Sequence, residues 1–392
     1  MSTPVDLPEL SEEEQAHSER LIERIRDEID SHAGWISFER YMEMALYEPG
    51  LGYYSAGATK LGEAGDFVTA PEISPLFSHC LANQAREVLE RLGGGDILEI
   101  GAGSGAMAAD ILAELHRIGS LPDRYFILEV SADLRERQRS RLAQLPEEVN
   151  SRVEWLDHWP DELRGVVLGN EVLDAMPMQR FRIRGDAVNC VGVTWQLGQL
   201  DWSEVKADAA LERRVREIEQ ELGERFPDGY GSEINMRLPS WMQGLALSMS
   251  AGVAILIDYG LPRRQYYRPE RSEGTLLCHY RHRFHDDALI HVGVQDIGAW
   301  VDFTAVAEAA SNAGMNVAGF STQAHFLIGC GIEQFIADLA GADLHQRVQL
   351  ARQAMLLTLP GEMGERFKVI GLTTNYEHSL RGFSVRDLAA SL

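Results

Sequence analysis

The sequence is poor in lysine and in positive charge. Only three of its 392 residues are lysine, and 60 acidic side chains stand against 36 basic ones, which gives a formal net charge of -24. Because phosphate groups and anionic membranes are bound by clustered Lys and Arg, this balance excludes a broadly basic nucleic-acid-binding protein and argues against docking on a membrane. It permits a cationic ligand or a basic protein substrate.

Cysteine and long apolar runs are scarce as well. The four cysteines, Cys80, Cys190, Cys278 and Cys330, are widely spaced and form no C-x-x-C pair, which is typical of a reducing compartment. No window approaches the apolar length that spans a bilayer. The opening residues MSTPVDLPEL have neither the basic and apolar regions of a signal peptide nor an Arg-rich leader. We therefore expect a cytoplasmic protein.

The order of the apolar segments predicts an α/β fold. Short apolar runs alternate with helical stretches, as in a parallel, doubly wound sheet. These runs lie at residues 96–100, 125–130, 153–156, 165–169 and 253–259. Further strands are expected at 316–321 and 365–373. Residues 181–202 alternate polar and apolar side chains instead, which predicts β-hairpins.

The length of the chain fits two domains or one domain with large insertions. The change of pattern after residue 180 indicates an inserted lobe. We therefore divide the chain into an N-terminal helical arm with a site-closing loop (1–92), the first part of the core (93–180), an inserted lobe of helices and β-hairpins (181–250), and the rest of the core with a helical insertion (251–392).

A glycine-rich turn between the first sheet strand and the next helix is the clearest functional signal. Gly101, Gly103 and Gly105 follow Glu99 there. Glycines let the backbone approach a ligand closely and leave N–H groups exposed at the start of a helix. The turn also satisfies the dinucleotide fingerprint through Gly101, Gly103 and Ala106, so an NAD-dependent oxidoreductase stays open at this point, as does a tight turn without a ligand.

Three details favour S-adenosylmethionine (SAM) as the ligand. The run is G-x-G-x-G after Glu99, the second strand ends in Glu129, and the fourth strand ends in an acid-rich turn. A carboxylate after the second strand can bind both ribose hydroxyls. A carboxylate near the glycines suits a cationic donor with an amino group. We expect Glu99, the three glycines and Glu129 to bind SAM.

The acid-rich turn contains Asn170, Glu171 and Asp174, at the carboxyl edge where open α/β sheets bind ligands. Glu171 and Asp174 are three residues apart, so a helical turn would place both carboxylates on one side. Two carboxylates can grip a guanidinium by bidentate hydrogen bonds. We expect all three residues to be catalytic, with Asn170 also reaching the cofactor; the alternative is a capping turn. Asp296 and Asp302 either cap helices or line an acceptor cleft.

The segment GDFVTAPEIS precedes the helix that leads into the first sheet strand. Here Gly65 begins the turn, Asp66 and Thr69 can face the methionine end of SAM, and Phe67 can exclude water. We count these four residues among the cofactor-binding ones. As bare sequence the segment is also only a turn and a helix start.

His279, His282, His285 and His291 lie close together in the sequence. No acid or cysteine completes a metal-ligand set, and neighbours such as Arg281 would oppose a cation. We therefore expect an Arg/His-rich surface loop and no metal.

Several longer motifs occur in the order of one known family. They are GDFVTAPEISPLF (65–77), LEIGAGSG (98–105), GNEVLDAMP (169–177), IDYG (257–260), GTLLCHYRHR (274–283) and QDIGAWVDFT (295–304). On these motifs the chain resembles the MidA family of class I SAM-dependent methyltransferases over roughly residues 35–375. That family includes the mitochondrial complex I assembly factor that methylates arginine. One residue departs from the pattern, because Trp300 stands where a His commonly precedes VDF.

The resemblance implies a Rossmann-like, seven-stranded methyltransferase sheet, SAM as donor and an arginine-containing protein as acceptor. In the mitochondrial member the reaction is symmetric dimethylation of a respiratory-chain subunit. The resemblance places the three glycines against the donor, Glu129 on its ribose, Asn170, Glu171 and Asp174 on the acceptor side, and Gly65, Asp66 and Phe67 over the site. Two other functions also remain open: a SAM-binding assembly factor without catalysis, and a small-molecule methyltransferase.

Overall fold

The computed structural model describes residues 7–56, 68–338 and 344–392, so Gly65, Asp66 and Phe67 lie outside the described residues. The chain forms two compact units, each built from three stretches of sequence. Unit 1 is Met1–Phe67, Asp174–Leu238 and Arg263–Trp300, and unit 2 is Val68–Leu173, Pro239–Pro262 and Val301–Leu392. None of the helices in the described ranges is long and apolar enough to cross a membrane.

Unit 2 contains one mainly parallel sheet. Its strands are β2 (Asp96–Ile100), β3 (Tyr125–Leu128), β4 (Val153–Leu156), β5 (Leu163–Asn170), β10 (Met249–Leu261), β14 (Val301–Asp302), β15 (Asn316–Thr322) and β16 (Phe367–Thr374). Seven of them lie on one path in the order β15-β16-β10-β5-β2-β3-β4, with β14 beside β10. Only β16 runs antiparallel to both of its neighbours on this path. The predicted doubly wound, mainly parallel sheet is confirmed, and β14 adds an eighth strand to the seven that were expected.

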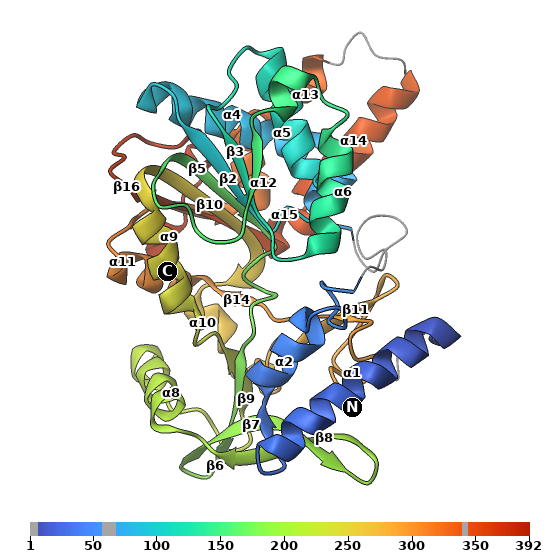
Figure 1. Ribbon diagram of the computed structural model, residues 1–392. Helices are drawn as coiled ribbons and strands as arrows, with labels where there is room; N and C mark the ends of the chain where they lie inside the picture. The colour runs from blue at the N-terminus through green and yellow to red at the C-terminus, as the bar shows by residue number, and fades with distance from the viewer. Residues whose placement is uncertain (1–6, 57–67, 339–343) are drawn as a thin grey trace. The chain divides into compact units, whose positions relative to one another are not determined.

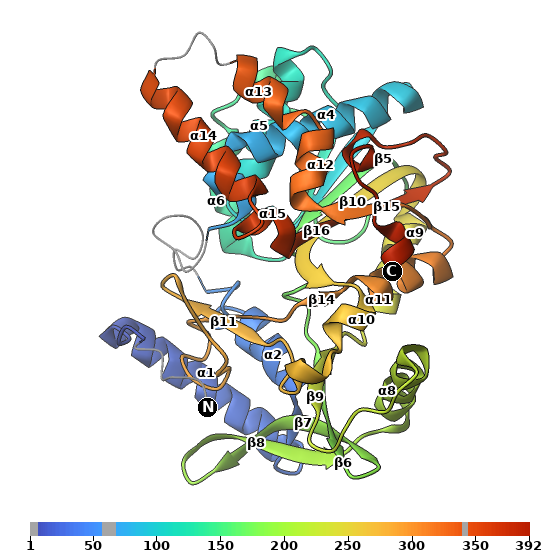
Figure 2. The same cartoon turned by 180° about the vertical axis from the view of Figure 1, so that it is seen from behind.

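Helices cover both faces of this sheet (Figures 1 and 2). The helices α4 (Pro75–Leu92), α5 (Ala106–Arg117) and α6 (Ala132–Leu142) lie over one face, and α9 (Leu238–Ser248) and α11 (Phe303–Asn312) over the other. The strands therefore bury side chains on both faces, which explains their continuous apolar runs. Ile97, Ile127, Val166 and Ile255 meet α4 and α5 in one core.

The strand order fixes where unit 2 can bind a ligand. The chain leaves β2 towards β3 on one side and returns in β5 on the other side of β2. The carboxyl ends of β2 and β5 therefore form a topological switch point, where open α/β sheets bind their ligands. The glycine turn follows β2 and Asn170 ends β5.

Unit 1 is built around an antiparallel sheet in the order β1-β7-β6-β9, with β8 beside β7. Its strands are β1 (Ile36–Ser37), β6 (Gln179–Arg184), β7 (Ala187–Gln196), β8 (Gln199–Lys206) and β9 (Gly231–Ile234). The β-hairpins predicted at 181–202 are confirmed. The helices α1 (Glu12–Ser31) and α2 (Phe38–Tyr47) share an apolar core with this sheet, through Leu21, Phe38 and Val193 among others.

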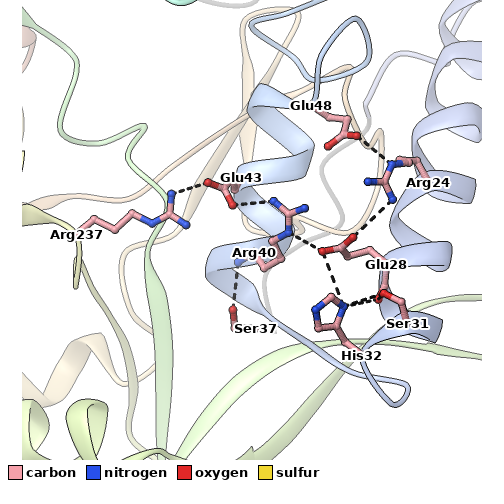
Figure 3. Close-up of polar contacts among 9 residues, drawn as sticks. All are labelled: Arg24, Glu28, Ser31, His32, Ser37, Arg40, Glu43, Glu48 and Arg237. Carbon is pink, nitrogen blue, oxygen red and sulfur yellow. Dashed lines mark hydrogen bonds and ion pairs between the residues drawn. The ribbon is translucent and has the colours of Figure 1, made fainter. Parts of the chain in front are cut away.

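A row of alternating charges joins α1 to α2 in unit 1 (Figure 3). Arg24 pairs with Glu28 at 3.6 Å, Glu28 with Arg40 at 2.9 Å, Arg40 with Glu43 at 2.8 Å and Glu43 with Arg237 at 2.7 Å. Hydrogen bonds from Arg40 and Arg237 hold the pKa values of Glu28 and Glu43 below their usual range. Each inner charge thus has an opposite charge on both sides.

The histidine-rich segment of unit 1 is not the surface loop that we expected. It forms a small sheet from β11 (Leu277–Tyr280), β12 (Arg283–His285) and β13 (Asp296–Gly298). His285 is buried, and burial lowers the pKa of His279 to about 4, so both imidazoles favour the neutral form. In the described ranges, no group of three or more His, Cys, Asp or Glu side chains is arranged to hold a metal.

Candidate functional site

The glycine turn of unit 2 adopts backbone conformations that favour glycine. Gly101, Gly103 and Gly105 have φ angles of 65°, 54° and 80°, in the left-handed region. A Cβ added at Gly105 would also lie only 3.3 Å from Cα of Gln138. A side chain at Gly105 would therefore push α6 away from the turn. The turn leads directly into α5, which begins at Ala106.

Glu99 lies beneath this turn, inside the sheet. Only 1% of the residue is exposed, and Tyr125 donates a hydrogen bond from its hydroxyl to Glu99 Oε2 at 2.5 Å. Burial raises the pKa of Glu99 to about 7, although the hydrogen bond from Tyr125 lowers it. Glu99 is therefore linked to β3 through Tyr125, and its charge depends on pH near neutrality.

Glu129 follows β3 at the carboxyl edge and is held by two donors. Its Oε1 accepts from the backbone N–H of Ser131 at 2.9 Å, and its Oε2 accepts from Gln138 Nε2 at 3.1 Å. Burial raises the pKa of Glu129, while both hydrogen bonds lower it. A carboxylate can accept about four hydrogen bonds, so each oxygen can still accept another from a ribose hydroxyl. The next side chain, Val130, is 77% exposed and offers an apolar surface for a flat base.

The turn after β5 differs from the expectation. Glu171 has a φ of 54°, and residues 171–176 form turns and bends, so the helical turn that would align Glu171 with Asp174 is absent from this described segment. Asn170 Nδ2 donates to Glu171 Oε1 at 3.0 Å, and the N–H of Glu171 donates to the carbonyl of Ile257 at 2.8 Å. A left-handed conformation costs a non-glycine residue roughly 1–2 kcal/mol, and such strain tends to occur at functional sites.

Asn170 supplies a further indication of a ligand. Its Oδ1 is buried and has no hydrogen-bond partner among the described residues. A buried acceptor without a donor costs roughly 1–3 kcal/mol, so Oδ1 is a natural partner for an N–H or O–H group of a bound molecule.

The other predicted acids have separate positions. Asp174 is buried in unit 1, where its carbonyl accepts from the N–H of Ala299 at 3.2 Å. Asp296, also in unit 1, accepts from the Tyr54 hydroxyl at 2.9 Å. Asp302 caps α11 by accepting from the backbone of Thr304 and of the next residue, as the capping alternative predicts. The pairing of Glu171 with Asp174 stays a prediction.

The segment after Phe67 is linked to the glycine turn. Thr69 begins the short helix α3 (Ala70–Ile73), and its side chain makes no capping hydrogen bond. Glu72 in this helix accepts a hydrogen bond from Ser104 Oγ and pairs with Arg141 at 3.3 Å. Arg141 also donates to Ser104 Oγ at 2.9 Å. The structure thus joins α3, the glycine turn and α6.

Sequence reasoning missed four residues of this region, namely Glu72, Val130, Gln138 and Arg141. A signal existed for Gln138, because it interrupts the apolar stripe of Leu134 and Leu142 at four-residue spacing. A polar residue in such a stripe faces the core and needs buried partners. The other three carry no pattern of their own.

The residues of unit 2 fit SAM as a cofactor. The glycine turn lets the backbone approach a ligand closely at the switch point, Glu129 can accept from ribose hydroxyls, Val130 presents an apolar surface, and Asn170 Oδ1 is an acceptor without a partner among the described residues. An open sheet of this order with these residues defines a class I SAM-dependent methyltransferase.

Comparison with known proteins agrees with this class. The model of a family of S-adenosyl-L-methionine-dependent methyltransferases matches residues 80–321. A crystal structure of a COG1565 superfamily member from Burkholderia thailandensis, bound to S-adenosyl-homocysteine, is 38% identical, with a TM-score of 0.94 over 99% of this chain and 100% of that one. The chain therefore belongs to this family of SAM-dependent methyltransferases.

Curated relatives extend the similarity to animals. The protein arginine methyltransferase NDUFAF7 of Mus musculus is 29% identical over 86% of this chain and 81% of its own length. The NDUFAF7 homolog of Drosophila melanogaster is 26% identical over 95% of this chain and 89% of its own length. Both are named as mitochondrial proteins, which contradicts the cytoplasmic location expected from the sequence.

Proposed function

We propose that this methyltransferase transfers methyl groups from SAM to arginine side chains of a protein. The observation that carries the proposal is the similarity to arginine methyltransferases along 86–95% of the chain, and not only along the SAM-binding part. The acid excess supports it, because a guanidinium in a basic protein segment is attracted to an acidic surface.

SAM supplies an electrophilic methyl carbon on a cationic sulfur. The acceptor cannot be deprotonated in advance, because the pKa of arginine exceeds about 12. The chain must therefore orient a guanidinium nitrogen and stabilise its charge while the proton leaves. We assign the guanidinium to Glu171 and Asp174, with Asn170 fixing the rotamer of Glu171 through the 3.0 Å hydrogen bond. Positioning and electrostatics supply the acceleration.

The cofactor contacts follow from the site in unit 2. We assign SAM to Glu99, the glycine turn, Glu129, Asn170 and the segment of Gly65, Asp66, Phe67 and Thr69. For the acceptor we propose a subunit or an assembly partner of a respiratory complex, on the strength of the family resemblance.

The deciding experiment compares methylarginine in the proteins of a wild-type strain and of a strain lacking this chain, by mass spectrometry. Restoring the gene should restore the modification, and E171Q or D174N should not, although both variants bind SAM normally. The exposed Glu147 provides the matched control E147Q, which should restore it fully. Methylarginine at wild-type level in the strain with E171Q and D174N combined would refute the assigned roles.

The same strains separate the two remaining alternatives. A SAM-binding assembly factor without catalysis predicts that no methylated protein depends on the gene, even though the purified chain binds SAM. A small-molecule methyltransferase predicts that labelled methyl groups from SAM appear in the low-molecular-weight fraction and not in protein.

A further inference from the structure

Gln138 occupies an unusual position for a polar residue. It is fully buried on α6, in the apolar stripe between Leu134 and Leu142. A buried amide without partners would cost several kcal/mol in an apolar medium, so its hydrogen bonds explain why it is tolerated.

Both ends of the Gln138 amide are engaged. Nε2 donates to the carbonyl of Gly103 at 2.9 Å and to Glu129 Oε2 at 3.1 Å. Oε1 accepts from Trp155 Nε1 at 2.9 Å. Because an indole N–H can only donate, Oε1 must face Trp155, and the NH₂ group must face Gly103 and Glu129. The orientation of the amide is thereby fixed.

The backbone at Gln138 also limits the glycine turn. Cα and Cγ of Gln138 both lie 3.3 Å from the point where Gly105 would carry a Cβ. One helical turn further, Arg141 holds Ser104 by a hydrogen bond of 2.9 Å. Gln138 and Arg141, on one face of α6, therefore donate hydrogen bonds to two consecutive residues of the glycine turn, Gly103 and Ser104.

We propose that Gln138 is a positioning residue of the SAM site, which holds the glycine turn and the ribose-binding carboxylate of Glu129 at a fixed separation. One side chain joins two segments that come from different strands, β2 and β3. The inference rests on the SAM dependence of the family and not on arginine as the acceptor, so it can be tested without an acceptor.

Gln138 also influences the charge of Glu129. The hydrogen bond from Gln138 lowers the pKa of Glu129, against burial, which raises it. Removing the donor therefore raises the pKa of Glu129. As the pH falls, the carboxylate becomes protonated earlier, so affinity for the cofactor should be lost at a higher pH than in the wild type. Ser131, Arg135 and Glu99 also face Glu129. They are unchanged in the variants, so the difference between two pH profiles isolates Gln138.

The test measures binding of S-adenosyl-homocysteine to the full chain by calorimetry between pH 5 and 9. Q138M keeps the length of the side chain and removes both ends of the amide. It should raise Kd about tenfold or more at pH 8, because a hydrogen bond to a charged group is lost. The pH at which Q138M loses affinity for S-adenosyl-homocysteine should be higher than in the wild type. Q144M makes the same change at exposed Gln144 and should bind like the wild type.

A role in folding alone gives a different result. If Q138M unfolds at a lower temperature but keeps the wild-type Kd and pH profile, the proposal is refuted. Should Q138M fail to fold, Q138N decides, because its shorter amide keeps the polarity of the site but cannot reach Trp155 on one side and Gly103 and Glu129 on the other. Wild-type affinity in Q138N at pH 8 would equally refute the proposal.

Discussion

Arg180 and Glu233 form a buried ion pair across β6 and β9 of unit 1, with Arg180 Nε 3.0 Å from Glu233 Oε1. The second carboxylate oxygen accepts from the backbone N–H of Thr275 at 2.8 Å. The guanidinium lies 4.9 Å from the ring centre of Trp202. The pair thus joins the sheet of unit 1 to the GTLLCHYRHR motif, whose first residues bind Glu233.

Replacing Arg180 by Met should destabilise unit 1 by about 3–5 kcal/mol, because it leaves a buried carboxylate without its cation. Urea unfolding followed by tryptophan fluorescence measures the loss. Arg184 makes a solvent-exposed pair with Glu204 at 2.6 Å, so R184M is the matched control and should change stability little. Equal effects of the two variants would contradict this account.

Gly274 should not tolerate alanine. It has a φ of 84°, and an added Cβ would collide with the carboxylate of Glu233. G274A should therefore lose more stability than the roughly 1–2 kcal/mol of a left-handed conformation alone. Gly185 has a φ of 58° and open space around its Cα, so the loss of stability in G185A measures the cost of the left-handed conformation alone. A loss in G274A no greater than in G185A would show that the carboxylate moves aside freely.

Glu99 makes the stability of unit 2 depend on pH. Its pKa is raised from 4.5 to about 7, so its contribution is fully present below pH 4.5 and is lost as the pH rises through 7. E99Q should therefore exceed the wild type in stability at pH 8, by up to about 3 kcal/mol, and the difference should shrink towards pH 5. Denaturant unfolding at both values measures it. The exposed Glu154 provides the control E154Q, which should show no such difference.

Replacing Glu171 by glycine should raise the stability of the protein and abolish methyl transfer. Its φ of 54° favours glycine, so E171G should gain about 1 kcal/mol in the free energy of unfolding while methyl transfer is lost. Leu197 has a φ of 51° and is fully exposed in the turn between β7 and β8. L197G should gain similar stability and keep activity. A stable, fully active E171G would remove Glu171 from the catalytic residues.

The strands of unit 2 could be predicted because each appears in the sequence as a short, continuous apolar run. The run at 96–100 coincides with β2, and the runs at 125–130 and 165–169 differ from β3 and β5 by only one or two residues at an end. The strands are buried on both faces, so hydrophobicity alone marks them. The positions of Gly101, Gly103 and Gly105 followed from the same reasoning, since the turn must end the first strand.

The features that sequence could not predict depend on contacts between distant segments. The strands β11 and β12 were missed because Arg281, His282 and Arg283 hide their short apolar pattern. The left-handed Glu171 was missed because its N–H is fixed by the carbonyl of Ile257, a residue of another strand. A contact between residues so far apart in the chain leaves no pattern in the sequence around Glu171.

The division of each unit into three stretches of sequence has a consequence for synthesis on the ribosome. Tyr41 of α2 donates its hydroxyl hydrogen bond to the carbonyl of Ala288 at 2.5 Å, and Ile36 pairs with Val193. At about 5–20 residues per second, the partner of Tyr41 is made roughly 10–50 s after Tyr41 itself. During that interval the apolar faces of α1 and α2 are without their native cover. The nascent chain should therefore bind a ribosome-associated chaperone until the last stretch of unit 1 has emerged.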